Sequence, residues 1–346
     1  MFDRPAVTDD QIVAAIEERF GLDVSALEFL ALGHDAHAWT FRATTNGDDA
    51  LFVKIRRRID PARLRLARFL EDAGFDAIVA PLATTDGATS VPIDALHLVV
   101  YPFVEGSLAA EVGLNDAQWI EYGRIVAALH ATRLSPELAE ALPKEAFIPA
   151  WTEAFRQVDA RISAFTGDDP VRRELVTYWR EHHDQIARIA ARAEALGARL
   201  RATLAATGGT QPGFVPCHGD IHTHNLLVQP GGRLRVIDWD EALLAPRERD
   251  LMFVMGSPIG LAPGERELAR FEQGYGRLDV DPVRLAFYHL DWASQDITGY
   301  AEQAMLDDIS AESRAYAFRI FRGAFDPGGE AEVAERFDRA IDAPGR

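Results

Sequence analysis

The chain has 346 residues and a formal net charge of −18, and 48% of its residues are hydrophobic. This length suits one large domain or two lobes that share a cleft, and the apolar fraction is sufficient for a sizeable core. The negative charge argues against nucleic acid or an anionic membrane as a general partner and favours a cationic small molecule, although acidity also serves plain solubility.

Cysteine content and hydropathy exclude further classes. Cys217 is the single cysteine, which excludes an internal disulfide framework and a cysteine-based zinc site. No apolar run near residue 1 resembles a signal peptide, and no stretch reaches the ~20 apolar residues of a membrane span. We therefore expect a cytoplasmic protein without a membrane partner.

Two helix starts are visible in the first hundred residues. Thr8 and Gln11 form a capping-box pattern ahead of apolar residues at helical spacing, which predicts a helix over 8–20. Asp60 followed by Pro61 is typical of a helix cap with proline at the first helical position, and this helix is expected to end near residue 72.

Short apolar runs separated by turn residues predict antiparallel strands in the same region. These runs are 27–32, 39–43, 51–55, 78–82 and 96–103. The composition changes after Gly106, and we expect a β-rich, nucleotide-binding N-lobe over 1–105 and a helical, catalytic and acceptor-binding C-lobe over 106–346.

The second region is expected to be mainly helical. Asn115 and Gln118 mark a helix start, with Trp119, Tyr122, Val126 and Leu129 as its apolar stripe. The segments 170–206 and 264–341 lack strand signals, and the first of them ends at breaks around Gly208-Gly209 and Pro212-Gly213. Two short strands, 226–228 and 234–237, flank Pro230-Gly231-Gly232, which predicts a hairpin.

The motif HGDIHTHN at 218–225, followed by VIDWD at 236–240, carries the chemistry. Asp220, Asn225 and Asp238 have the spacing with which kinase-like enzymes align a hydroxyl against a nucleotide γ-phosphate. Asp220 is the candidate base, and Asn225 and Asp238 are the candidate Mg²⁺ ligands. Loop residues of these types also cap ordinary turns, but the returning hairpin brings the second carboxylate back beside the first.

The neighbouring polar residues have less defined roles. We expect His218 to hold the loop through a hydrogen bond, and His222 and His224 to pack it, because magnesium prefers oxygen ligands to imidazole. Asp240 shares a strand face with Asp238 and either contacts the acceptor or caps the next turn.

Three segments are candidates for nucleotide binding. Lys54 lies on an apolar strand, where it is either an exposed edge charge or the partner of the α- and β-phosphates. The loop at 32–41 is placed to cover phosphates but has the single glycine Gly33. The run at 97–106 contains Tyr101, Pro102, Phe103 and Val104, whose backbone is placed to hold adenine if this run is a hinge and not only a core strand.

Acidic residues concentrate towards the C terminus. Seven acids and a single basic residue, Arg284, lie between Asp279 and Asp308, and the pairs Asp291/Glu302 and Asp296/Asp307 each share a helix face. This pattern is either a solvated helix surface or an acidic wall for ammonium groups, with Trp292 and Tyr300 placed to pack a ring.

HGDIHTHN with VIDWD resembles the aminoglycoside phosphotransferase and choline kinase superfamily, and IDWDEALLAPRERDLMFV at 237–254, EDAGF at 71–75 and YPFVEG at 101–106 are most similar to its spectinomycin-type members. The resemblance implies an α+β, protein-kinase-like fold with a five-stranded N-lobe and a larger helical C-lobe. It implies ATP or GTP with Mg²⁺ as cofactors, Asp220 as base, Asn225 and Asp238 as metal ligands, and Lys54 at the phosphates. It also implies an adenine hinge at 101–104 and acceptor-side acids at Asp240, Asp291 and Asp296.

The chain departs from the family in the loop at 32–41, which has one glycine, and in the helix after the lysine strand. The family has a glutamate early in the helix after the lysine strand, where this chain has Pro61, so Asp60 or Glu71 remains as the candidate partner of Lys54. The leading hypothesis is ATP-dependent O-phosphorylation of a cationic antibiotic such as spectinomycin. A metabolite kinase acting on choline, ethanolamine, homoserine or a sugar is the alternative, and a non-catalytic binding protein is a third. A protein kinase is disfavoured because an A-P-E motif is absent.

Overall fold

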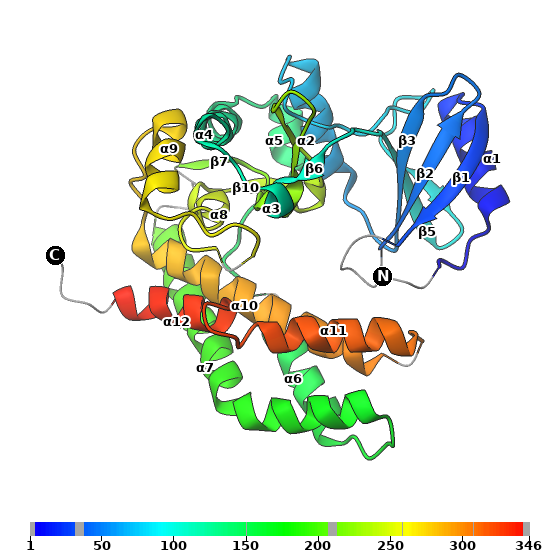
Figure 1. Cartoon of the computed structure of the whole chain (residues 1–346). Helices are drawn as coiled ribbons and strands as arrows, with labels where there is room; N and C mark the ends of the chain where they lie inside the picture. The colour runs from blue at the N-terminus through cyan, green and yellow to red at the C-terminus, as the bar shows by residue number, and fades with distance from the viewer. Residues whose placement is uncertain are drawn as a thin grey trace. The chain divides into compact units, whose positions relative to one another are not determined.

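Figure 1 shows the computed structural model of the chain, which describes residues 4–31, 38–149, 151–206, 213–257, 259–306 and 308–341. The chain forms two compact units. The sheet unit comprises Met1–Leu114, Arg133–Pro143 and His218–Ala242, and the helical unit comprises Asn115–Thr132, Lys144–Cys217 and Leu243–Arg346. These units group residues by proximity, and the functional division into lobes at 1–105 and 106–346 stays a prediction.

The sheet unit is built on a five-stranded antiparallel sheet in the order β1-β2-β3-β5-β4. Its strands are β1 (Val24–Leu30), β2 (Ala38–Thr45), β3 (Ala50–Arg56), β4 (Val91–Ile93) and β5 (Leu96–Pro102). Helix α1 (Asp9–Phe20) begins with the predicted capping box and buries Ile12 and Ile16 with Phe41 and Val53 of the sheet. Figure 1 shows α1 lying along this sheet.

Helix α2 (Pro61–Asp72) confirms the predicted start after β3. The Asp60 carboxylate accepts a hydrogen bond from the Ala62 N–H at 2.9 Å, and Pro61 occupies the first helical position. Leu64 and Leu66 face inward and are buried. The cap therefore fixes where α2 begins, directly after the strand that carries Lys54.

The strand predicted at 78–82 is wrong. Ile78 forms only an isolated bridge with Val236, and the Val79 N–H donates to the Val236 carbonyl oxygen at 3.0 Å. Pro81 has no N–H to donate, so a ladder cannot continue through this segment. The strand next to β5 at that end of the sheet is β4, which the sequence patterns did not indicate.

A three-stranded sheet in the same unit carries the motif residues. It pairs β6 (Ser107–Leu108), β8 (Leu226–Val228) and β9 (Leu234–Val236), and the predicted hairpin turn between β8 and β9 is confirmed. Two short 3₁₀ turns flank this hairpin, η1 (Thr223–Asn225) and η2 (Trp239–Glu241). Short helices α3 (Ala109–Val112) and α5 (Pro136–Ala141) complete the unit.

The helical unit confirms the predicted helices over 115–131, 170–206 and 264–341. Its helices are α4 (Asp116–Ala131), α6 (Trp151–Ser163), α7 (Pro170–Ala206), α8 (Glu248–Leu251), α9 (Glu265–Tyr275), α10 (Pro282–Met305), α11 (Ala311–Gly323) and α12 (Glu330–Ile341). The strands β7 (Phe214–Cys217) and β10 (Leu243–Pro246) form a two-stranded sheet that was not predicted. Gly208, Gly209 and Pro212 of the predicted break lie outside the described residues.

Close helix packing in this unit depends on glycine. Helices α4 and α9 approach so closely that a Cβ at Gly274 would lie 1.9 Å from the Ile120 carbonyl oxygen, and one at Gly123 would lie 2.2 Å from that of Phe271. Together the two units confirm the α+β class, with a small antiparallel sheet and a larger set of helices. None of the helices in the described ranges has the length and apolarity needed to cross a bilayer.

Candidate active site

The motif loop 218–225 is held by His218, as predicted. Its Nδ1 accepts a hydrogen bond from the Asp220 N–H at 3.2 Å, and its Nε2 donates to the Ile237 carbonyl oxygen at 3.0 Å. Its ring also contacts Trp239, with 4.6 Å between ring centroids. His218 therefore joins the loop to the chain that leaves β9, and it is a structural residue.

The Asp220 carboxylate is held by a hydrogen bond from Asn225 and by a close contact with His222. Asn225 Nδ2 donates to Asp220 Oδ2 at 2.9 Å and to the Asp220 carbonyl oxygen at 2.7 Å. On the other side, His222 Nε2 lies 3.1 Å from Asp220 Oδ1. His222 Nδ1 accepts from the His224 N–H at 3.2 Å, so the ring proton is on Nε2 and faces the carboxylate.

Lys54 lies between two acids that follow β9. Its Nζ is 2.8 Å from Asp238 Oδ1 and 2.6 Å from Asp240 Oδ2. Asp238 adopts a left-handed backbone conformation with φ of +63°, which an aspartate tolerates better than most residues. This turn returns both carboxylates towards β3, and the hydrogen bond from the Ile237 N–H to the Asn225 carbonyl oxygen, at 3.0 Å, ties Asn225 to the same turn.

Lys54 and Asp238 each stabilise the charged form of the other. Burial disfavours the charged form of Lys54, but the carboxylates of Asp238 and Asp240 outweigh it and raise the pKa of Lys54 above its ordinary value. Partial burial likewise disfavours the Asp238 carboxylate, yet nearby Lys54 lowers the pKa of Asp238. Both groups are therefore ionised at neutral pH.

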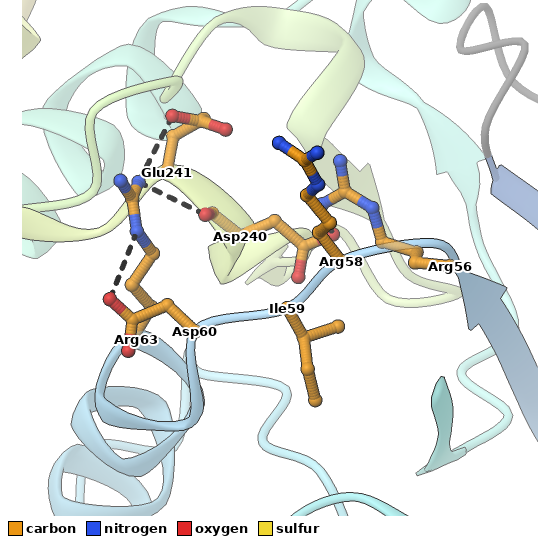
Figure 2. Close-up of a pocket in the computed structure, with 7 residues that line it drawn as sticks. All are labelled: Arg56, Arg58, Ile59, Asp60, Arg63, Asp240 and Glu241. Carbon is orange, nitrogen blue, oxygen red and sulfur yellow. Dashed lines mark hydrogen bonds and ion pairs between the residues drawn. The ribbon is translucent and has the colours of Figure 1, made fainter. Parts of the chain in front are cut away.

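Two arginines extend the ion-pair network around Asp240 (Figure 2). Arg56 Nη1 is 2.5 Å from Asp240 Oδ2, and Arg63 Nη1 donates to the Asp240 carbonyl oxygen at 3.1 Å and to Glu241 at 3.0 Å. These side chains line an open cavity of about 290 Å³ together with Arg58 and Asp60. Asp240 is consequently surrounded by cations of β3 and α2.

Neither acid that the sequence suggested as the partner of Lys54 is paired with it. Asp60 caps α2 and has the Arg63 guanidinium within 4.0 Å. Glu71, near the other end of the helix, pairs with Arg68 at 2.8 Å. Among the described residues, the ion pairs of Lys54 are those with Asp238 and Asp240.

The predicted adenine hinge lies at the end of β5. Tyr101 is buried, and burial raises the pKa of its hydroxyl well above the ordinary value, so the ring is neutral. Its ring packs near Phe52. Tyr101 belongs to an apolar cluster with Leu64, Val79 and Val99, and Val104 packs against this cluster. The Phe103 N–H donates to the Ala50 carbonyl oxygen at 3.0 Å. Gly33, the remaining predicted nucleotide residue, lies outside the described residues.

The predicted acceptor residues other than Asp240 lie on α10 in the helical unit. Trp292 is 6% exposed and meets Phe253 edge to face, with ring centroids 5.0 Å apart. Burial raises the pKa of Asp291 to about 7, against the opposing charge of Arg249. Asp296 hydrogen-bonds with Glu330 of α12, and burial raises the pKa of Glu330 to about 7.

The remaining residues of the predicted acidic wall differ in burial. Tyr300 is half-buried, whereas Glu302 is exposed at the end of α10. Asp307 lies outside the described residues. An acceptor role for the α10 residues therefore stays a prediction.

The motif donors suit a divalent metal ion. The side-chain nitrogen of Asn225 donates to Asp220, which leaves the side-chain oxygen Oδ1 of Asn225 as the atom for a cation. The Asp238 side chain is 38% exposed and ionised. An amide oxygen and a carboxylate are the hard ligands that magnesium prefers.

Two contacts at this site were not predicted. We expected His222 only to pack the loop, and Arg56 was not singled out. The alternation of β3 was the available signal for Arg56, because residues 54 and 56 share a strand face. No local signal indicated that His222 turns its ring towards Asp220.

Comparison with known proteins identifies the family of the chain. Residues 28–288 match the phosphotransferase enzyme family. Protein StrN of Streptomyces griseus is 26% identical over 301 residues, which cover 84% of this chain and 85% of StrN. A solved spectinomycin phosphotransferase, in complex with ADP and spectinomycin, is 27% identical with a TM-score of 0.80, covering 97% of this chain and 100% of that chain.

A more distant structure shows the same fold. Amicoumacin kinase, solved with AMP-PNP and Ca²⁺, is 15% identical with a TM-score of 0.59, and the match covers 96% of this chain and 97% of that chain. The protein-kinase-like fold is thus confirmed. The chain belongs to the phosphotransferase enzyme family, and it is a small-molecule kinase.

Proposed function

We propose that the protein transfers the γ-phosphoryl group of ATP to a hydroxyl of a cationic small molecule, an aminocyclitol or aminoglycoside antibiotic such as spectinomycin. The observation that carries this proposal is the Asp220 carboxylate, oriented by Asn225 and His222 in a loop tied to the Lys54–Asp238 pair. The similarity to a spectinomycin phosphotransferase over nearly the whole chain supports this class of acceptor.

Each motif residue has one task in this proposal. Asp220 accepts the hydrogen bond of the acceptor hydroxyl and takes its proton as the oxygen attacks the γ-phosphorus, while the bond from that phosphorus to the bridging oxygen breaks and ADP leaves. Asn225 and Asp238 hold Mg²⁺, which when bound neutralises negative charge on the phosphates. Lys54 contacts the α- and β-phosphates from β3.

The base of the nucleotide binds at the segment Tyr101–Val104. Because the Phe103 N–H already donates to Ala50, the hydrogen bonds to adenine come from the backbone of its neighbours. The apolar cluster beside Tyr101 provides a dry surface for the ring. GTP would use the same backbone groups with a different pattern of donors and acceptors, so the panel below includes it.

Acidic residues recognise the acceptor. Asp291 and Asp296, with Trp292 and Tyr300 beside them on α10, supply carboxylates and aromatic surface for an aminated ring. The net charge of −18 attracts a cationic substrate at long range. Asp240 was also predicted to contact the acceptor.

An acceptor panel tests the proposal. ADP release is measured with magnesium–ATP and separately magnesium–GTP, against spectinomycin, other aminoglycosides, choline, ethanolamine and homoserine. We expect turnover with spectinomycin or a related aminocyclitol. Turnover confined to choline, ethanolamine or homoserine would establish a metabolite kinase instead, and nucleotide binding without turnover on any acceptor would indicate a binding protein.

A further inference from the structure

The two carboxylates on Lys54 are not equivalent. The side chain of Asp238 is 38% exposed, whereas that of Asp240 is 9% exposed. The contact of Lys54 Nζ with Asp240, at 2.6 Å, is also the shorter of the two. Asp238 is therefore accessible to a dissolved cation, while Asp240 is enclosed by the basic side chains of its own unit.

Asp240 is fixed from two directions. Arg56 follows Lys54 by two residues on the same face of β3 and approaches the same oxygen, Asp240 Oδ2, at 2.5 Å. Arg63 of α2 donates to the Asp240 carbonyl oxygen at 3.1 Å. Both the side chain and the main chain of Asp240 are consequently anchored, which is what a group needs if it is to hold a flexible lysine in one place.

Helix α2 supplies no acid for this task. Its first turn contains no acidic residue, and Asp60 is used as the helix cap. Glu71 pairs with Arg68 near the other end of the helix. The basic residue Arg63 faces the turn after β9 instead and contacts Asp240 and Glu241, so α2 holds Lys54 indirectly, through Asp240.

We propose that Asp240 is the positioning residue that holds Lys54 for the nucleotide phosphates when Asp238 turns to the divalent cation. Lys54 and Arg56 then carry two positive charges against the single negative charge of Asp240, which leaves one net positive charge facing the triphosphate. The inference rests on the proposed function, and it replaces the acceptor contact predicted for Asp240 with a role on the nucleotide side.

The two other roles open to Asp240 make different predictions. If Asp240 contacts the acceptor, its removal raises KM for the acceptor and leaves KM for magnesium–ATP unchanged. If Asp240 is itself a cation ligand, its removal raises the magnesium concentration needed for half-maximal rate, whether or not Lys54 is present. A positioning residue acts through Lys54 alone, and its effect disappears with Lys54.

The test is a double-mutant cycle in the full chain. Asp240→Asn, Lys54→Met and the double variant are compared by ADP release from magnesium–ATP, with spectinomycin and without added acceptor, when water takes the phosphoryl group. Glu71→Gln is the matched control, because it removes the acid of α2 that the sequence suggested as the partner of Lys54. Thermal unfolding of each variant establishes that it is folded, and Asp240→Glu provides a second variant that keeps the charge.

We expect Asp240→Asn to lower kcat/KM for magnesium–ATP by roughly 100-fold, because a shift of about 1 Å in the Lys54 ammonium misaligns the phosphates that it holds. The double variant should be no slower than Lys54→Met, KM for the acceptor should not change, and Glu71→Gln should match the wild type. Asp240→Glu should show a smaller loss that also vanishes with Lys54→Met, and it carries the test if Asp240→Asn does not fold.

Three results would each overturn the inference. The first is a loss of kcat/KM in the double variant equal to the combined losses of the two single variants. The second is a magnesium requirement that Asp240→Asn raises both with Lys54 and with Lys54→Met, and the third is a loss in Glu71→Gln as large as that in Asp240→Asn. If the wild type turns over magnesium–ATP and Asp240→Asn has the same kcat/KM, the inference is overturned and the proposed function stands. Wild-type protein that neither binds magnesium–ATP nor releases ADP would contradict the proposed function, and the inference with it.

Discussion

Replacing Asp220 with asparagine tests the proposed base with little change in shape. Asp220 Oδ2 accepts from Asn225 Nδ2 at 2.9 Å, and Oδ1 lies 3.1 Å from the proton-bearing Nε2 of His222. Both neighbours are donors, so the new NH₂ group faces a donor whichever way the amide turns. One polar contact of the carboxylate is lost, at a cost of about 1–3 kcal/mol, and the 21% exposure of the side chain places the cost towards the lower end.

The effect on turnover should be much larger than the effect on stability. Loss of a general base lowers kcat by ~10²–10⁴-fold, which corresponds to about 3–5 kcal/mol of transition-state stabilisation. ADP release measures kcat, calorimetry with magnesium–ATP measures nucleotide binding, and thermal unfolding establishes that the variant is folded. Asp184→Asn is the control, because the Asp184 side chain is 97% exposed on α7. A folded Asp220→Asn variant with near-wild-type kcat would refute the assignment.

Three further predictions follow from individual contacts. His222→Phe should lower kcat about tenfold without changing KM for the acceptor, because Asp220 loses an orienting partner. His222→Gln should restore part of the rate. Equal rates in wild type and His222→Phe would contradict the orienting role. Burial raises the pKa of Asp291 to about 7, with Glu145 adding to the shift and Arg249 opposing it, so the free energy of unfolding should fall as pH rises from about 4 to about 7. Asp291→Asn should remove this loss, so that the variant is more stable than wild type at pH 8 but not at pH 4 in urea unfolding; an unchanged pH profile would argue against a buried carboxyl. Gly274→Ala should destabilise the fold by about 1–3 kcal/mol, because its Cβ would lie 1.9 Å from the Ile120 carbonyl oxygen, and an unchanged midpoint in the same assay would show that α4 and α9 can separate.

Local chemistry made much of the fold predictable. The capping boxes at Thr8 and Asn115 and the Asp60-Pro61 start satisfy backbone N–H groups within one turn, so the signal and the structure lie in the same few residues. The β8–β9 hairpin was predictable for the same reason, because its turn residues separate two short apolar runs. The error at 78–82 arose because an apolar run indicates burial without specifying a ladder, and Pro81 prevents one.

Pairing between distant segments was not predictable. The strands β7 and β10 are short, and they pair with each other across segments that are distant in the sequence. The partner of Lys54 is the clearest case at the site, since Asp238 and Asp240 follow it by 184 and 186 residues. The motif spacing predicted which residues carry the chemistry, whereas the contacts of Lys54 depend on how β3 and the turn after β9 come together.

The central claim is that the chain phosphorylates a hydroxyl of a cationic small molecule. The most direct measurement is mass spectrometry of spectinomycin after incubation with the wild-type protein and magnesium–ATP, with the Asp220→Asn variant in parallel. We predict that the antibiotic gains the mass of one phosphoryl group with the wild type, and that the variant yields product at least about 100-fold more slowly. Unmodified spectinomycin from wild-type protein that turns over magnesium–ATP with choline or another metabolite would contradict the proposed acceptor, and equal product from the variant would contradict the role of Asp220.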